Sequence, residues 1–230
     1  MKSSVTAIVP NYNDAQYINL SVKKLLEVDE ISEIIIVDDA STDNSLEIIK
    51  DIVEKNKKVQ FIKLSKNSGK GNAIKSAFSL VKTSYTVIHD SDLEYNPKDI
   101  ILLISKINSS KNNLILGSRF KNNISERIYL RTFYANKFIS LFFSLLYGVK
   151  ITDVATCYKL MPTKFLQTTT FKENGFAIEI ELLAKYLKFN REISEVNIYY
   201  KPRSYQQGKK IKFFDGIRYL FAIMRYRFLN

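Results

Sequence analysis

The stretch Ile34-Ile35-Ile36-Val37-Asp38-Asp39 is a continuous apolar run that ends in two carboxylates. Such a run is typical of a strand that is buried on both faces, as in the parallel sheet of an α/β protein. We therefore predict a strand over residues 31–37. Ligands of these sheets bind beyond the carboxyl ends of the strands, so Asp38 and Asp39 mark a sheet edge where a site is expected.

The same pattern extends along the first half of the chain. Further strands are predicted at residues 5–9, 59–64, 85–89 and 114–116, and helices at 17–28, 45–55, 71–82 and 97–107. This alternation predicts an α/β fold with a mostly parallel, Rossmann-like sheet that helices cover on both faces. Polar clusters follow four of the strands, so they are expected to meet in space.

Residues 116–230 are less regular. Helices are predicted at 128–147 and 176–188, a strand at 193–200, and an amphipathic helix at the C-terminus. The stripe of this last helix is Phe214, Ile217, Phe221, Met224 and Phe228, with Arg218 and Arg225 beside it. Three interpretations of this stripe are open: it lies in a lipid interface, it packs against the sheet, or it forms an oligomer interface. No repeat or linker divides the chain, so we expect one domain over residues 1–230.

Composition excludes several classes of protein. Cys157 and His89 are the only cysteine and histidine, which excludes a disulfide framework and argues against a Cys/His zinc site. No secretory signal is visible, and no apolar run reaches the roughly 18 to 20 residues of a spanning helix.

The net charge of +12 lies wholly in the second half of the chain. Residues 1–115 hold 15 basic and 15 acidic residues, whereas residues 116–230 hold 20 and 8. A basic half indicates an anionic partner, either nucleic acid, a phosphorylated ligand or anionic lipid, unless it serves solubility alone. Because no nucleic-acid-binding signature is present, we do not expect nucleic acid as a partner.

Asp90-Ser91-Asp92 follows the strand predicted at residues 85–89. Two carboxylates there would hold Mg²⁺ or Mn²⁺ together with the phosphates of a nucleotide. Glu94 would add a third ligand or cap the turn. A solvated acidic turn is the alternative interpretation.

Asp39 and Lys70 are candidates for nucleotide contacts. A carboxylate at a strand end accepts hydrogen bonds from a ribose or base, although the segment 39–43 also reads as a turn with a helix cap. Gly69-Lys70-Gly71 fails the Walker pattern, since Leu64 replaces its first glycine, but a lysine before a helix can still meet an anion.

Arg119, Arg203 and Lys209 lie in loops and suit contact with phosphate, with solvated basic side chains as the alternative. Asp153 is a candidate general base or acceptor-binding carboxylate, or else a helix cap. Glu179 and Glu181 are two apart on a predicted helix, so at most one of them should face the site.

Together these motifs resemble the family 2 glycosyltransferases with a GT-A fold. The motifs are Val9-Pro10-Asn11-Tyr12-Asn13, Val37-Asp38-Asp39-Ala40-Ser41, Gly69-Lys70-Gly71, Asp90-Ser91-Asp92-Leu93-Glu94, Gly117-Ser118-Arg119 and Thr152-Asp153. The tail from Tyr200-Lys201-Pro202-Arg203 to Gly208-Lys209-Lys210-Ile211 is similar to that of the dolichyl- and polyprenyl-phosphate sugar synthases.

The resemblance implies roles for individual residues. The nucleotide-sugar pocket would contain Pro10, Tyr12, Asp14, Val37, Asp39, Lys70, Asp90, Ser91, Asp92, Arg119, Arg203 and Lys209. The metal ligands would be Asp90, Asp92 and Glu94, and the catalytic residues Asp92, Arg119, Asp153 and Arg203. Residues 1–115 would bind the nucleotide sugar and metal, and residues 116–230 the acceptor and the membrane interface.

The resemblance also implies a reaction. An inverting enzyme would move a hexose from a nucleotide-diphosphate sugar, GDP-mannose or a UDP-sugar, to polyprenyl or dolichyl phosphate. The alternatives are transfer to a saccharide hydroxyl in surface polysaccharide synthesis, and an inactive module that binds nucleotide or membrane. We expect a cytoplasmic protein on the cytoplasmic face of a membrane, bound peripherally; a membrane-protein partner or a homo-oligomer would also fit.

Overall fold

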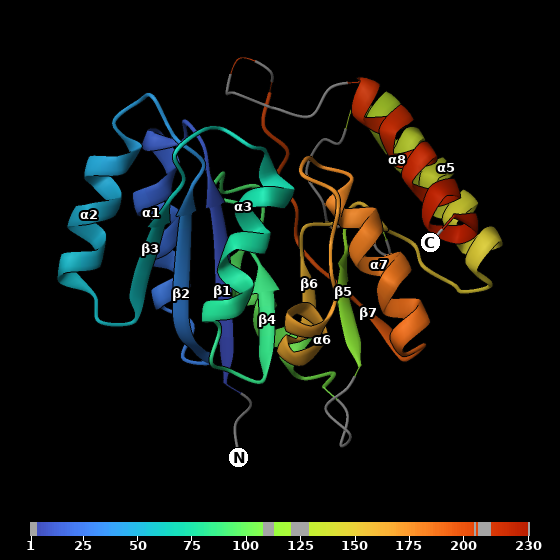
Figure 1. Ribbon diagram of the computed structural model, residues 1–230, viewed down its shortest axis with the longest axis horizontal. Helices are drawn as coiled ribbons and strands as arrows, with labels where there is room; N and C mark the ends of the chain where they lie inside the picture. The colour runs from blue at the N-terminus through green and yellow to red at the C-terminus, as the bar shows by residue number, and fades with distance from the viewer. Residues whose placement is uncertain (1–3, 108–112, 121–128, 205, 207–212, 230) are drawn as a thin grey trace.

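The computed structural model describes residues 4–107, 113–120, 129–204, 206 and 213–229. Within these ranges, seven strands form one sheet in the order β3-β2-β1-β4-β6-β5-β7 (Figure 1). The strands are β1 Val5–Asn11, β2 Ile31–Asp38, β3 Val59–Lys63, β4 Tyr85–Ile88, β5 Leu114–Ser118, β6 Lys159–Pro162 and β7 Ile193–Asn197. Strands β3, β2, β1 and β4 are parallel neighbours, and β5 is parallel to β7. The prediction of a mostly parallel sheet is therefore confirmed.

Helices cover both faces of the sheet, as predicted. They are α1 Ala15–Leu26, α2 Ser45–Lys55, α3 Lys70–Ala77, α4 Ile100–Ile104, α5 Leu130–Tyr147, α6 Thr163–Thr168, α7 Ile178–Phe189 and α8 Phe213–Phe228, with short 3₁₀ turns η1 Phe78–Leu80 and η2 Pro97–Asp99. In the view of Figure 1, α3, α6 and α7 lie in front of the sheet and α1 lies behind it. The apolar strands are thus enclosed, which accounts for their unbroken hydrophobic runs.

Strand β6 and helix α6 were not predicted. Strand β6 runs antiparallel to both β4 and β5 and joins the two halves of the sheet. It has only four residues, begins at Lys159 and ends at Pro162, so it lacks the alternation that identifies a strand. Lys159 is nevertheless fully buried, because the carboxylate of Glu179 in α7 lies 2.5 Å from its ammonium and neutralises its charge.

Helix α8 presents the apolar stripe predicted for the C-terminus to solvent. The stripe residues Phe214, Ile217, Phe221, Met224 and Phe228 are between 37% and 72% exposed. The face that packs inward is a different one, formed by Tyr219, Ala222, Ile223 and Tyr226. The alternative in which the stripe packs against the sheet is therefore wrong.

Helix α5 lies beside α8 and has an outward apolar face of its own (Figure 1). Its exposed residues recur at the helical spacing of three and four: Leu130, Tyr134, Phe138, Leu141 and Leu145. We call the exposed apolar residues named here for α5 and above for the stripe of α8, taken together, the apolar face. In the part of the chain that the structure describes, no helix combines the length and apolar character needed to cross a bilayer.

Candidate functional site

A cavity of about 320 Å³ opens at the carboxyl ends of β1, β2, β4 and β5. The predicted site residues that line it are Pro10, Tyr12, Asp14, Asp39, Lys70, Asp90, Ser91, Asp92, Glu94, Arg119 and Arg203. Segments far apart in the sequence thus meet at one place, which is where ligands of α/β sheets bind. Val37 lies elsewhere, fully buried inside β2. Lys209 lies outside the described residues.

Asp39 holds the Gly69-Lys70 loop in place. Its two carboxylate oxygens accept the backbone N–H groups of Ser68 and Gly69, each at 2.8 Å. Gly69 has a φ of +91°, and a Cβ on it would lie 2.6 Å from the carbonyl oxygen of Asn174. Only glycine allows this approach. The hydrogen bonds of Asp39 therefore set the start of α3 and the direction of Lys70.

Lys70 lies at the centre of a partly buried chain of alternating charges. Its ammonium is 2.7 Å from Asp90 and 2.9 Å from Glu179, and the other oxygen of Glu179 is 2.5 Å from Lys159. Burial alone would lower the pKa of Lys70, but the negative charges of Asp90 and Glu179 and the hydrogen bond to Asp90 outweigh it and raise the pKa well above its usual value. Lys70 is therefore a fixed cation beside Asp90.

Arg203 meets three carboxylates from the loops after β1 and β4. Its guanidinium lies 2.8 Å from Asp92, 3.4 Å from Asp14 and 3.6 Å from Glu94. Glu94 also accepts the Arg203 backbone N–H at 2.8 Å and the Tyr200 hydroxyl at 2.5 Å. Both oxygens of Glu94 are thus occupied in fixing the segment that carries Arg203.

Asp92 sits among like charges. Burial raises the pKa of Asp92 to about 7, helped by the charges of Glu94 and Asp90 and opposed by Arg203. Further positive charge beside Asp92 would therefore stabilise its ionised form. Asp90 and Asp92 both line the cavity, and two carboxylates of this kind would suit a Mg²⁺ or Mn²⁺ ion that takes its other ligands from substrate phosphates and water. Among the described residues, no group of three or more Asp, Glu, His or Cys side chains is arranged to bind a metal.

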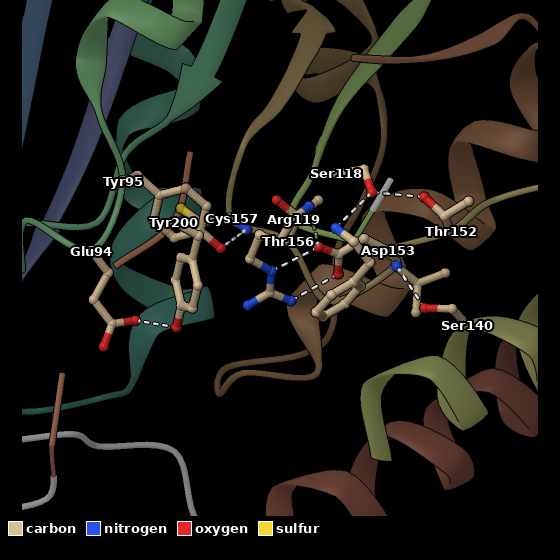
Figure 2. A network of polar contacts seen from close by, with 12 residues as sticks. Glu94, Tyr95, Ser118, Arg119, Ser140, Thr152, Asp153, Thr156, Cys157 and Tyr200 are labelled. Atoms are coloured by element: carbon tan, nitrogen blue, oxygen red, sulfur yellow. Dashed lines mark hydrogen bonds and ion pairs between the residues drawn. The ribbon is translucent and has the colours of Figure 1, made fainter. Parts of the chain in front are cut away.

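Arg119 is held by Asp153 (Figure 2). The guanidinium donates two hydrogen bonds of 2.7 Å to the carboxylate, and the Arg119 backbone N–H adds one of 3.1 Å. Asp153 is fully buried and does not line the cavity, whereas Arg119 does. The general-base prediction for Asp153 finds no support in this arrangement, because its oxygens are committed to Arg119 beneath the cavity.

Backbone strain is concentrated around the cavity. Asn13, Ala40 and Leu93 have φ between 50° and 61°, and each lies in a loop that follows one of the strands β1, β2 and β4. Non-glycine residues adopt this conformation at a cost of roughly 1–2 kcal/mol, and they cluster at functional sites. The strain therefore supports the assignment of these loops to a site.

Sequence reasoning missed several residues of the cavity wall. Phe176, just before α7, and Tyr219 of α8 both line the cavity. Glu179 faces inward while Glu181 accepts backbone N–H groups from Lys172 and Glu173, so the expectation that at most one of the two glutamates faces the site is confirmed. No sequence signal identified Tyr219, because the pattern of α8 was read from its exposed stripe.

Known proteins share this fold. The structure superposes on glucosyl-3-phosphoglycerate synthase from Mycobacterium tuberculosis, crystallised in complex with Mn²⁺, UDP and phosphoglyceric acid, with a TM-score of 0.73 at 15% identity. The match covers 99% of this chain and 80% of that one. The chain therefore has the GT-A fold.

Sequence comparison gives the family. The profile of glycosyl transferase family 2 matches residues 6–169. An uncharacterised protein of Methanocaldococcus jannaschii is 31% identical over 217 residues, which cover 89% of this chain and 93% of that protein. The dolichyl-phosphate β-glucosyltransferase of Saccharomyces cerevisiae is 26% identical over 84% of this chain, and the matched region is 66% of that enzyme. The chain belongs to glycosyl transferase family 2, which confirms the resemblance seen in its motifs.

Proposed function

We propose that this glycosyltransferase moves a hexose from a nucleoside-diphosphate sugar to a polyprenyl phosphate, with inversion, at a membrane surface. The observation that carries the proposal is one cavity that joins Asp90 and Asp92 to Lys70, Arg119 and Arg203. Carboxylates for a divalent cation and three basic groups for phosphate charge suit a reaction between a diphosphate donor and a phosphate acceptor.

The donor would bind with its diphosphate beside Asp90 and Asp92. A divalent cation held by these two residues would neutralise charge on the departing diphosphate. Arg203 lies 2.8 Å from Asp92, and Lys70 lies 2.7 Å from Asp90. Both cations would therefore lie beside the diphosphate. Positive groups fixed before the reaction stabilise the transition state more than flexible ones do.

The acceptor phosphate would bind Arg119. Asp153 orients the guanidinium of Arg119, and the Tyr200 ring lies over this group, with its centre 5.0 Å from the guanidinium carbon. An oxygen of this phosphate attacks the anomeric carbon while the bond from that carbon to the β-phosphate oxygen breaks. A phosphate is already an anionic nucleophile, so it requires positioning more than a strong base. This agrees with the commitment of Asp153 to Arg119.

The apolar face supports binding at a membrane surface. Leu130, Phe138 and Leu145 are exposed on α5, which packs beside α8, and Arg218 and Arg225 flank the exposed stripe of α8. Amphipathic helices with basic residues lie in the plane of a lipid interface. Tyr219 on the inner side of α8 lines the cavity, so one helix connects the site with this surface.

The relatives favour the same acceptor. The yeast enzyme is a dolichyl-phosphate glucosyltransferase by name, and the chain spans about two thirds of its length. Transfer to a saccharide hydroxyl remains the second candidate, and it would need a carboxylate base. The two candidates are separated by assaying a short polyprenyl phosphate and saccharide acceptors side by side, with the nucleoside diphosphate released as the readout. Release only with the saccharides would overturn the proposal.

A further inference from the structure

A second hollow, a groove of about 900 Å³, runs along the outside of α8. One wall is the segment 172–177 and the other is α8. The residues that line it are Lys172, Glu173, Asn174, Gly175, Phe176, Ala177, Arg218, Phe221, Ala222, Met224, Arg225, Phe228 and Leu229. Phe176 also lines the catalytic cavity, so the two hollows share one side chain as a common wall.

The lining of the groove is suited to a hydrocarbon chain. Phe221 and Phe228 are 72% and 62% exposed, an unfavourable state for large aromatic side chains in water. Ala177 and Ala222, two buried alanines with small side chains, also line the groove. An apolar ligand would cover the aromatic rings and fill the space over the alanines.

The edge of the groove is basic. Lys172, Arg218 and Arg225 line the groove. Arg218 lies 3.4 Å from Asp215, and Arg225 lies 3.4 Å from Glu173, which also accepts the Tyr226 hydroxyl at 3.0 Å. An apolar floor with a positive edge fits an anionic amphiphile, a hydrocarbon tail that ends in phosphate.

We propose that this groove binds the isoprenoid chain of the acceptor, with its phosphate passing Phe176 into the catalytic cavity. The inference rests on the proposed function, because it names the place of that acceptor's tail. The adjacency of the two hollows, which share Phe176 as a wall, supports it, and so does α8, which lines the cavity through Tyr219 and the groove through Phe221 and Met224. The exposed residues of α5 do not line the groove and would serve only the membrane surface.

The test compares acceptors of two lengths without any membrane. Prenyl phosphates of two and of four isoprene units are assayed below the concentration at which they aggregate, with no lipid or detergent. For the wild-type protein, kcat/KM for the four-unit acceptor should exceed that for the two-unit acceptor at least about tenfold, since the added carbons leave water. In a Phe221→Ser, Met224→Ser variant this ratio should fall towards one. Both side chains are exposed, so the variant should fold, and its melting temperature checks this.

Leu145→Ser is the matched control. Leu145 is 73% exposed on α5 and lies outside the groove, so this variant should keep the wild-type ratio. A ratio that survives in the groove variant, or that falls equally in both variants, overturns the groove as the site of the chain. A wild-type ratio near one also overturns it while leaving transfer to polyprenyl phosphate intact. Absence of transfer to either acceptor overturns the proposed function itself.

Discussion

The guanidinium of Arg203 lies 2.8 Å from the carboxylate of Asp92, although 111 positions separate the two residues in the sequence. Glu94 makes this contact possible, because it accepts the Arg203 backbone N–H at 2.8 Å and its backbone carbonyl accepts the Lys201 N–H at 2.9 Å. The C-terminal half thus delivers a cation to the acidic loop of the N-terminal half. The catalytic site therefore depends on both halves.

Replacing Arg203 tests its role towards the phosphates. Arg203→Ala should lower kcat about 100-fold with a smaller change in the apparent donor affinity, because the contact strengthens as charge develops on the leaving group. Arg203→Lys should recover part of the loss, since an ammonium supplies the positive charge without the paired hydrogen bonds of a guanidinium. Steady-state kinetics measure both. If Arg203→Ala changes the donor KM alone, Arg203 only binds the donor and does not act in the transition state.

Asp153 should be needed for stability as well as for activity. Asp153→Asn would leave the buried Arg119 guanidinium without its counter-charge, and we expect a loss of about 3 kcal/mol in the free energy of unfolding. Urea denaturation measures this loss. A general base would behave differently, with kcat lost and stability unchanged, and that result would contradict the assignment of Asp153 as a positioning residue.

Glu179 and Glu181 provide a matched pair on one helix. Glu179→Gln should lower kcat about tenfold, because Lys70 loses one of its two carboxylate partners at the cavity. Glu181 accepts the N–H groups of Lys172 and Glu173 away from the cavity, so Glu181→Gln should lower the melting temperature without changing kcat per folded molecule. Equal effects of the two variants on kcat would refute a specific role of Glu179.

The sequence predicted most of the first half of the chain because its strands are buried on both faces and its helices have a clear period. The helix at 45–55 and the strand at 31–37 agree with α2 and β2 to within a residue. The strand order could not be predicted, since it depends on β6, a four-residue strand whose lysine is buried only because Glu179 neutralises it. Sequence-distant charge pairs of this kind leave no local pattern.

The candidate site was predictable where a polar motif follows a strand. Asp39, Asp90 and Asp92 were found in this way, and all three line the cavity. The partners of these residues were not predictable. Asp153 was a plausible base by residue type alone, and only the bidentate contact with Arg119 assigns its oxygens. Val37 was carried over from the family motif, but its side chain is fully buried in the sheet.

Membrane binding tests the apolar face. The protein should sediment with vesicles that contain anionic lipid, and high salt should weaken the binding, because each basic residue near the surface contributes about 1 kcal/mol. A Leu130→Ser, Phe138→Ser, Leu145→Ser variant should bind less well, since all three side chains are at least 58% exposed on α5. Leu20→Ser, a change to an exposed leucine of α1, is the control. Protein that stays in the supernatant at low salt with excess anionic vesicles would exclude an interfacial role.

The proposed transfer to a lipid phosphate depends on a divalent cation held by Asp90 and Asp92. Its most direct test measures the release of nucleoside diphosphate from a panel of nucleotide sugars, with a short polyprenyl phosphate and Mg²⁺ or Mn²⁺. We predict release from at least one donor that requires the polyprenyl phosphate, stops in excess EDTA and is lost in a folded Asp92→Asn protein. Release that continues undiminished in EDTA or in Asp92→Asn would show that transfer does not depend on a cation held by these aspartates.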